Sequence, residues 1–304
     1  MHTSFRKQCA GFSLVEVLVA TAVLALLLSL LSMAVGATLS TIRHSQSTIE
    51  RFSSARAAFD LLTATLSQAT LNTYWDYDNP QDPQKYIRTS DLHFVITNSS
   101  HGQNLFFQSP LATSGVSPTP AGLLNEVGYW VEFGEDTWRP AHVETPRYRY
   151  RLMQGVSPTE SIDVFKDATS AWTNRVKSTG FPIAENVIAL ILWPRQPTAN
   201  DPNGTALTSD YQYNSRRTAG IQSHQLPPMV QATLIVLDEP SMVRIESGAT
   251  EPSVILSALT GKFQDVAKYE DDLREVLGAL AAEKINYTVL NVPVTLRESK
   301  WSSE

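Results

Sequence analysis

A single carboxylate stands inside a long apolar run near the start of the chain. In the stretch AGFSLVEVLVA, residues 10 to 20, Glu16 is the one ionisable residue, and the 26 residues from Val17 to Ile42 carry no ionisable side chain. An unpaired charge at the centre of a membrane-spanning helix costs about 2.5 kcal/mol or more. An opposite charge at the same depth makes such burial tolerable. These residues therefore predict charge pairing inside a membrane, with Glu16 as the anionic partner.

The histidines show no pattern that is typical of catalysis or metal binding. They have no H-x-x-x-H spacing, and the chain contains neither a G-x-S-x-G nor a Walker A pattern. We expect His93 and His142 to be strand or loop residues rather than ligands. The sequence therefore predicts no enzyme activity and no catalytic residue. The six histidines are His2, His44, His93, His101, His142 and His224.

One acidic stretch is a weak candidate for binding calcium. In DYDNPQD, residues 76 to 82, Asp76, Asp78 and Asp82 could supply oxygen ligands, and their alternation is similar to the start of an EF-hand loop. The glycine of that loop is absent, however, and Pro80 interrupts it. A solvated acidic turn is the favoured interpretation, and no other cofactor is expected.

Aromatic residues are the last candidates for a binding function. YWDY, residues 74 to 77, together with Trp130, Trp138, Trp172 and Trp193, could form a carbohydrate-binding face. In a domain of this size that is mostly β-structure, such residues more often pack in the core or at its edges. Packing is the favoured interpretation.

Composition narrows the class of protein. The 304 residues include 24 basic and 30 acidic ones, giving a net charge of −6 without a basic block, so the chain lacks the electrostatic features of a nucleic-acid-binding protein. Cys9 is the one cysteine, which excludes an intramolecular disulfide and a cysteine-based zinc site. The length allows one sizeable core or two small ones.

The apolar run is long enough to cross a membrane. At about 1.5 Å per residue, a helix from Val17 to Ile42 exceeds the roughly 30 Å thickness of the hydrocarbon layer. Arg6 and Lys7 precede it and no acid occurs among the first 15 residues, which places the N-terminus in the cytoplasm and exports the chain beyond the apolar run. A cleaved secretory signal has a shorter apolar region. A plain signal anchor explains the length but not Glu16.

The segment GFSLVEVLVATAVLALLL, after the leader MHTSFRKQCAG, closely resembles the class III signal of type IV pilins and pseudopilins. The resemblance implies that prepilin peptidase removes residues 1–11 by cutting after Gly11, and that the new N-terminal residue, Phe12, is then methylated. It also implies that Glu16 is an assembly residue, paired with the amine of Phe12 in a neighbouring subunit. The alternative is a glutamate that merely snorkels to the membrane surface. The partners implied are other pilin or pseudopilin subunits, the prepilin peptidase/N-methyltransferase and an inner-membrane assembly platform.

The helix is expected to continue beyond the membrane. We assign residues 12–39 to the membrane and residues 40–73 to an amphipathic continuation that ends near Leu71 and packs on the following domain. No proline precedes Pro80, so the kink of many pilins lacks its usual cause here, although a bend near Gly36 stays open. Apolar residues recur at spacings of three, four and seven: Ile42, Ile49, Phe52, Phe59, Leu62 and Leu66.

Residues 74–240 are predicted to be a β-rich exported domain. NEVGYWVEF (125–133) and RYRYRLM (147–153) alternate as half-buried antiparallel strands do, with the arginines on the outer face. NVIALILW (186–193) and MVQATLIVLDE (229–239) are more continuously apolar and predict central strands. DLHFVIT and QNLFFQS are expected to pair around the NSSHG turn. The stretches 109–122 and 194–228 are predicted to be loops, the second long enough to be mobile or to carry an interaction.

The order of these strands also resembles the minor pseudopilin J of type II secretion systems, over residues 12–240 and with loose motifs. Residues 241–304 depart from that pattern as a C-terminal helix-strand extension, with an amphipathic helix over 262–285 and a final strand in NYTVLNVPVTL. This part is similar to Verru_Chthon cassette protein C, a pilin-like protein of unknown role.

The combined expectation is an α+β, pilin-like fold: a long N-terminal membrane-spanning helix packed on an antiparallel sheet. The expected function is that of a structural, minor pseudopilin-like subunit of a pseudopilus or type IV pilus-like complex that serves protein secretion or surface contact. We expect a single-pass inner-membrane protein with a periplasmic C-terminal domain. The alternative is a membrane-anchored, exported binding module that does not polymerise; it shares these features except leader processing and a dependence on Glu16.

Overall fold

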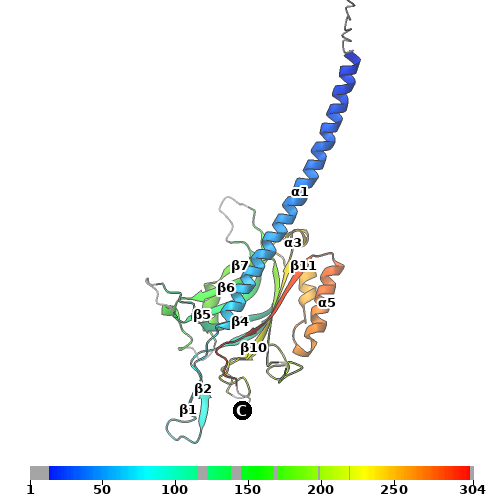
Figure 1. Ribbon diagram of the computed structural model, residues 1–304. Helices are drawn as coiled ribbons and strands as arrows, with labels where there is room; N and C mark the ends of the chain where they lie inside the picture. The colour runs from blue at the N-terminus through cyan, green and yellow to red at the C-terminus, as the bar shows by residue number, and fades with distance from the viewer. Residues whose placement is uncertain are drawn as a thin grey trace, which may run out of the picture. The chain divides into compact units, whose positions relative to one another are not determined.

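The computed structural model describes residues 14–115, 122–137, 145–166, 170–197, 199–218 and 220–301; within the first helix, the side chains of residues 36–51 are not described. The chain divides into two compact units, Met1–Ile49 and Glu50–Glu304. Helix α1, Leu14–Ser67, contributes its first part to one unit and its second part to the other (Figure 1). The helix is continuous through Gly36, and it ends at Ser67 rather than near Leu71.

The second part of α1 is amphipathic and packs on the domain. Phe59, Leu62 and Leu66 are buried in the largest core cluster, together with residues of the sheet. Arg56 and Asp60 lie on the exposed side of the helix. Burial of one apolar stripe therefore holds this part of α1 against one face of the sheet.

The main sheet is mixed rather than wholly antiparallel. In the described residues it has nine strands, seven of them in the order β11-β10-β8-β4-β5-β6-β7, with β3 paired to β4 and the short β9 paired to β3. Gly102 of β4 and Leu190 of β8 form a parallel pair, and the other pairs are antiparallel. The expected antiparallel sheet is therefore wrong at this junction, where two antiparallel groups of strands meet with neighbouring strands running the same way. The bounds are β3 Val95–Ser99, β4 Gly102–Ser109, β5 Asn125–Glu135, β6 Tyr148–Ser157, β7 Phe181–Glu185, β8 Val187–Arg195, β9 Tyr213–Asn214, β10 Met229–Leu237 and β11 Tyr287–Thr295.

The two most apolar strands lie in the interior of the sheet, as predicted. β8 and β10 pair with each other, and each has another strand on its far side. Leu190 and Leu192 face the cluster that contains α1, whereas Ala189 and Ile191 face a second cluster on the opposite side. Because both faces are covered, β8 is apolar from Val187 to Trp193 and β10 is apolar from Leu234 to Leu237, without alternation in these stretches.

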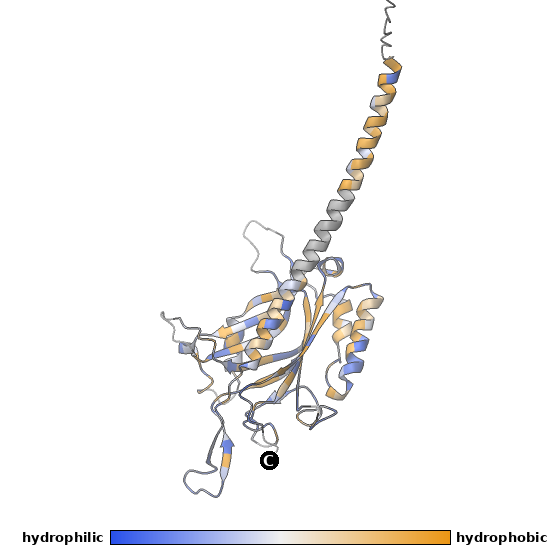
Figure 2. Ribbon diagram, viewed as in Figure 1, coloured by the Kyte–Doolittle hydropathy of each residue, from blue (hydrophilic) through white to orange (hydrophobic). Residues whose placement is uncertain are grey.

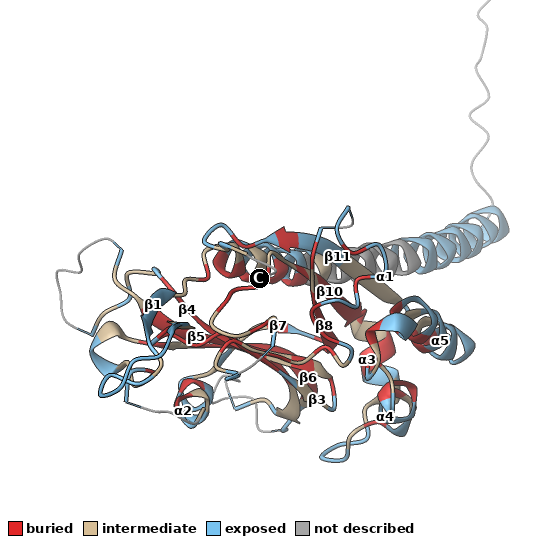
Figure 3. Cartoon of the chain, turned by 90° about the horizontal axis from the view of Figure 1, so that it is seen from below, coloured by how far each residue is buried: buried red, intermediate tan, exposed pale blue. Residues whose placement is uncertain are grey.

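Helices cover the other face of the sheet, so the unit Glu50–Glu304 has three layers (Figure 3). Part of that face packs against Trp172 and Val176 of α2. The part formed by β8 and β10 packs against Val276 and Leu280 of α5. These helices are α2 Trp172–Ser178, α3 Glu239–Ile245, α4 Ser253–Leu259 and α5 Tyr269–Ala282, with 3₁₀ turns at Thr159–Ser161 and Val266–Lys268.

Two glycines let α2 lie directly on the sheet. Gly128 of β5 and Gly155 of β6 are register partners. A Cβ atom at Gly155 would lie 2.2 Å from the carbonyl oxygen of Val176 in α2, and one at Gly128 would lie 2.8 Å from a side-chain carbon of Val176. The helix can therefore approach this closely only because neither strand presents a side chain there.

The prediction that β5 and β6 are half-buried is wrong. They do pair antiparallel, but most of their residues are buried on both faces. Arg149 and Arg151, expected on an outer face, are 3% and 2% exposed. Arg149 is tolerated there because its guanidinium meets two carboxylates, and Arg151 donates a 2.6 Å hydrogen bond to the carbonyl of Gly134.

The last part of the chain completes the same sheet. β11 pairs with β10 from Tyr287 to Thr295. The expected helix over 262–285 is shorter: a 3₁₀ turn at 266–268 precedes α5, whose first turn holds Glu270, Asp271 and Asp272. Three acids suit the positive end of the helix dipole. Residues 241–304 thus supply the strand that borders β10 and the helices that cover it.

The stretch 194–228 is largely packed rather than a mobile loop. Tyr211 and Tyr213 within it are fully buried. Strand β9 pairs with β3, and the side chain of Gln222 donates to the carbonyl of Leu207 at 2.7 Å. The segment is polar in composition, but the buried rings of Tyr211 and Tyr213 fix it against the sheet.

Candidate functional site

The first part of α1 is a segment of membrane length with no packing of its own. Leu14–Val35 spans 22 residues with a mean hydropathy of 2.6 (Figure 2), and none of it is buried. At about 1.5 Å per residue this length matches the roughly 30 Å hydrocarbon layer. Leu14 is 80% exposed and Met33 is 71% exposed. Such a surface is far more stable in lipid than in water, because transferring apolar surface out of water is favourable.

Glu16 stands in the first turn of α1 and its side chain is exposed. It is the one ionisable residue between Leu14 and Val35. A carboxylate in the first turn of a helix is favoured by the unpaired N–H groups and by the positive end of the dipole. The helix end therefore offsets part of the cost of the charge, and a cation at the same depth would offset more.

Gly11 and Phe12, the predicted cleavage and methylation residues, lie outside the described residues. The same holds for Cys9 and for the leader cations Arg6 and Lys7. The roles of Gly11, Phe12 and Glu16 therefore stay predictions. What the structure contributes is the helical register of Glu16 and the apolar surface that comes after it.

The three predicted calcium ligands lie on a two-stranded hairpin, β1 Tyr74–Tyr77 and β2 Tyr86–Thr89. Asp78 Oδ1 accepts hydrogen bonds from the backbone N–H groups of Asn79, Gln84 and Lys85 at 2.9, 3.0 and 3.2 Å. The bonds from Gln84 and Lys85 are the main cause of the lowered pKa of Asp78. This oxygen therefore already organises the turn.

Asp76 and Asp82 are engaged in the same hairpin. Asp76 accepts from the N–H of Tyr77 at 2.8 Å, and Asp82 accepts from the side chain of Gln84 at 3.1 Å. Within the described residues no group of three or more histidine, cysteine or acidic side chains is arranged to hold a metal ion. The carboxylate oxygens of these residues already accept hydrogen bonds within the turn, which fits a turn better than a cation site. Calcium binding stays a prediction.

The histidines that the structure describes with side chains take part in buried or half-buried networks. The ring of His93 contacts Asn214 at 2.9 Å and accepts from the indole N–H of Trp172 at 3.2 Å. His101 contacts Glu251 at 2.7 Å, and Glu251 also accepts from the hydroxyl of Tyr150 at 3.0 Å. His93 lies in the segment leading into β3, in agreement with the expectation of a strand or loop residue; His142 is outside the described residues.

Sequence reasoning missed the polar cluster around Arg149. Its guanidinium contacts Glu246 at 2.7 Å and Glu239 at 3.5 Å, and Glu239 also accepts from the side chain of Asn186 at 2.9 Å. Burial opposes ionisation of Glu246, but the hydrogen bond and charge of Arg149 outweigh it and lower the pKa of Glu246. The acids lie about ninety residues after the arginine, so local spacing carries no signal for the cluster.

Comparison with known proteins identifies the N-terminal segment. Residues 6–32 match the family described as Prokaryotic N-terminal methylation motif. No match was found among curated proteins or among solved structures. The matched residues include Gly11, Phe12 and Glu16 and most of the exposed apolar helix.

The match gives the chain a prepilin-type N-terminus. It indicates a substrate of prepilin peptidase and supports a type IV pilin-like protein that assembles with other pilin subunits. Together with the apolar helix segment Leu14–Val35, it supports membrane anchoring. It also favours a structural subunit over an enzyme. The helix followed by a mixed-sheet domain is consistent with an α+β pilin-like layout.

Proposed function

We propose that this chain is a minor pseudopilin-like subunit of a pseudopilus or type IV pilus-like complex. One observation carries the proposal: the prepilin-type motif covers an apolar helix, without packing of its own, that leads into a separately folded unit. Residues 12–39 hold the subunit in the inner membrane with its N-terminus in the cytoplasm, and the unit Glu50–Glu304 faces the periplasm.

Assembly exchanges lipid contacts of the helix for contacts with neighbouring helices. Removal of residues 1–11 exposes the amine of Phe12, a cation near the depth of Glu16. Pairing between the Glu16 carboxylate of one subunit and the Phe12 amine of its neighbour neutralises both charges in a medium of low dielectric constant. The same pairing fixes the axial offset between subunits, because both groups lie at one end of the helix.

Two resemblances suggest where the subunit acts. The order of strands over residues 12–240 resembles pseudopilin J, which favours a type II secretion pseudopilus serving protein export. Residues 241–304 resemble Verru_Chthon cassette protein C, which favours a related complex whose task is not secretion. Partners in both cases are other pilin subunits, the prepilin peptidase/N-methyltransferase and an inner-membrane assembly platform.

N-terminal sequencing and intact mass of the protein purified from membranes that contain the peptidase test the proposal directly. The expected mature chain begins at Phe12 and carries one methyl group on its amine. A Gly11 variant with a bulky residue should keep the leader, whereas a Cys9→Ala variant should be cut normally. An intact Met1 terminus on the wild-type protein would contradict the proposal and leave a tethered, non-polymerising binding module as the better account.

A further inference from the structure

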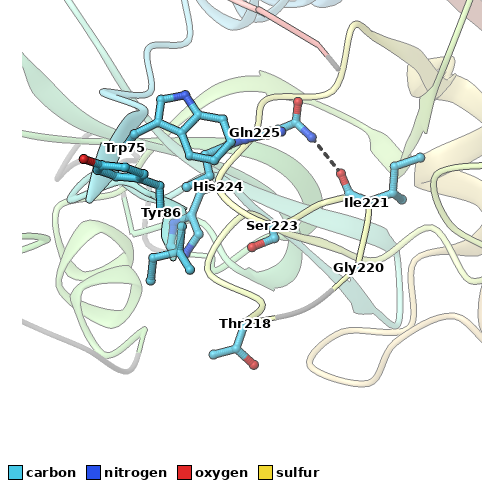
Figure 4. A pocket seen from close by; sticks show the side chains of 10 residues that line it. Trp75, Tyr86, Thr218, Gly220, Ile221, Ser223, His224 and Gln225 are labelled. Atoms are coloured by element: carbon cyan, nitrogen blue, oxygen red, sulfur yellow. Dashed lines mark hydrogen bonds between the residues drawn. The ribbon is translucent and has the colours of Figure 1, made fainter. Parts of the chain in front are cut away.

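A cavity of about 530 Å³ lies between the β1–β2 hairpin and a loop that contributes Thr218 and residues from 220–225 (Figure 4). We call it the hairpin pocket. Its volume falls in the range typical of small-molecule sites. Every residue that lines it belongs to the unit Glu50–Glu304, and none belongs to the membrane helix.

Aromatic rings form the hairpin side of the pocket. Trp75 pairs with Arg88 across the hairpin and Tyr77 pairs with Tyr86, so these four side chains share one face of the ribbon. Trp75 is 65% exposed and Tyr86 is 63% exposed, unlike the buried tryptophans of the domain. Arg88 lies 5.6 Å from the ring centre of Trp75, and Tyr77 stacks on Tyr86 at 5.0 Å. These contacts limit the rotamers of rings that remain open to solvent.

Polar groups form the opposite side. Thr218 and Ser223 bring hydroxyl groups and Gln225 brings an amide, whose N–H donates to the carbonyl of Ile221 at 3.1 Å. Figure 4 shows Ser223 and Gln225 on the loop across the pocket from Trp75 and Tyr86, with the amide of Gln225 directed to Ile221 and Thr218 farther along the loop. The pocket thus combines aromatic faces with neutral hydrogen-bonding groups and one cation, Arg88.

His224 joins the two sides. Its carbonyl accepts from the hydroxyl of Thr73 at 2.8 Å, and its ring contacts the hydroxyl of Ser90 at 3.1 Å; these residues flank the hairpin. His224 has a φ of +52°, a conformation that non-glycine residues adopt at some energetic cost. The hairpin and the loop are therefore held in a fixed relation before any ligand arrives, which lowers the entropic cost of binding.

We propose that the hairpin pocket binds a pyranose unit of a neutral oligosaccharide. The C–H face of a pyranose ring stacks on an exposed aromatic ring, while its hydroxyl groups exchange hydrogen bonds with hydroxyl, amide and imidazole groups. Both requirements are met on facing sides of one cavity of suitable size. The chain carries a net charge of −6, which disfavours a polyanionic ligand such as a nucleic acid. The proposal does not depend on whether the subunit polymerises.

Isothermal titration of the full chain tests the proposal. The protein is held in lauryldimethylamine oxide, a detergent without a sugar headgroup, and titrated separately with cellotetraose, chitotetraose, mannotetraose and maltotetraose. We expect saturable binding of at least one of them. Trp75→Ala and Tyr86→Ala should each weaken that binding by about tenfold or more, because exposed aromatic rings dominate such contacts. Thr218→Val, which removes only a hydroxyl group, should weaken it by a smaller factor.

Phe181→Ala is the matched control, since Phe181 is an exposed ring on β7, a strand at the far edge of the sheet. It should bind like the wild type, and thermal melting should show that all variants are folded. The proposal is overturned if none of the four sugars gives saturable binding, or if Trp75→Ala binds as tightly as the wild type. Sedimentation provides the remaining outcome: self-association that depends on Trp75, without sugar binding, would make the hairpin a contact between subunits instead.

Discussion

The side chain of Gln103 accepts a hydrogen bond from the backbone N–H of Leu192 at 2.9 Å, at the place where β4 and β8 run parallel. Gln103 is 1% exposed, and its amide N–H group lies 3.4 Å from the carbonyl of Phe263. One residue before it, a Cβ atom at Gly102 would lie 2.1 Å from the carbonyl oxygen of Leu190. The side chain of Gln103 thus takes the place of a backbone carbonyl as acceptor for the N–H of Leu192, at the junction of the two antiparallel groups of strands.

Replacing Gln103 by Leu should destabilise the domain. The N–H of Leu192 would lose its acceptor while buried, which costs about 1–3 kcal/mol of unfolding free energy. Chemical denaturation of the full chain in detergent, followed by tryptophan fluorescence, measures the loss. Gln264→Leu, at an exposed position, is the control and should change little. Equal effects of the two substitutions would show that the Gln103 bond has no net value.

Substitutions of Arg149 and of its partner Glu246 are expected to have opposite effects on the stability of the domain. Arg149→Met removes the cation between Glu246 and Glu239 and should cost about 3 kcal/mol or more, because breaking a buried ion pair leaves an unpaired charge. Adding Glu246→Leu should recover part of that loss. The same denaturation experiment measures both variants. If the double variant is less stable than Arg149→Met alone, Glu246 contributes through something other than its pairing with Arg149.

The imidazole of His224 predicts a dependence of stability on pH. Burial, with the positive charges of Arg216 and Arg88, lowers the pKa of His224, so the unfolded chain binds this proton more readily than the folded one. Stability linked to this group is therefore present above its ordinary pKa and is lost as the pH falls through the window below that value. His224→Asn, which tolerates the positive φ, should lose less stability than the wild type between about pH 7.5 and about pH 5. Identical losses in both proteins would exclude this linkage.

Asp78 is expected to hold the tip of the β1–β2 hairpin. Asp78→Ala should speed the exchange of the amide hydrogens of Gln84 and Lys85, whose donors lose their acceptor, whereas Asp82→Ala should change them less. Hydrogen exchange with calcium and with a chelator also tests the predicted cation site. Protection that rises with calcium in the wild type and not in Asp78→Ala would support calcium binding; no difference would remove it.

Glu16 is expected to act in assembly and not in processing. Glu16→Ala should still yield a chain that begins at Phe12 but should lose crosslinks between N-terminal helices, because the Phe12 amine would have no anionic partner in the membrane. Ser29→Ala, another polar residue of the same apolar segment, should assemble normally. Complexes unchanged by Glu16→Ala would favour the tethered binding module.

The sequence predicts features that repeat locally and misses those that join distant residues. The continuous apolar run VIALILW indicates that β8 is buried on both faces. The spacing of Phe59, Leu62 and Leu66 indicates that one face of α1 is packed. The burial of Arg149 is invisible locally, because its partners Glu239 and Glu246 come about ninety residues later. The parallel pair of Gly102 and Leu190 is hidden for the same reason.

The same difference between local and distant features applies to the candidate functional residues. Glu16 stands out because a short motif surrounds it. The hairpin pocket needs Trp75 and Ser223 to meet across the fold, and only the composition of YWDY hinted at it.

The late position of β11 along the chain bears on how a growing polypeptide reaches its final form. Along its whole length β10 pairs with β11, although about fifty residues lie between the two strands, so this pairing must await a distant segment. Until then β10 offers bare N–H and C=O groups on an apolar strand, which invites pairing with other chains. A nascent chain halted before residue 287 would therefore be prone to aggregate with other chains, because the edge of β10 stays unpaired until β11 is made.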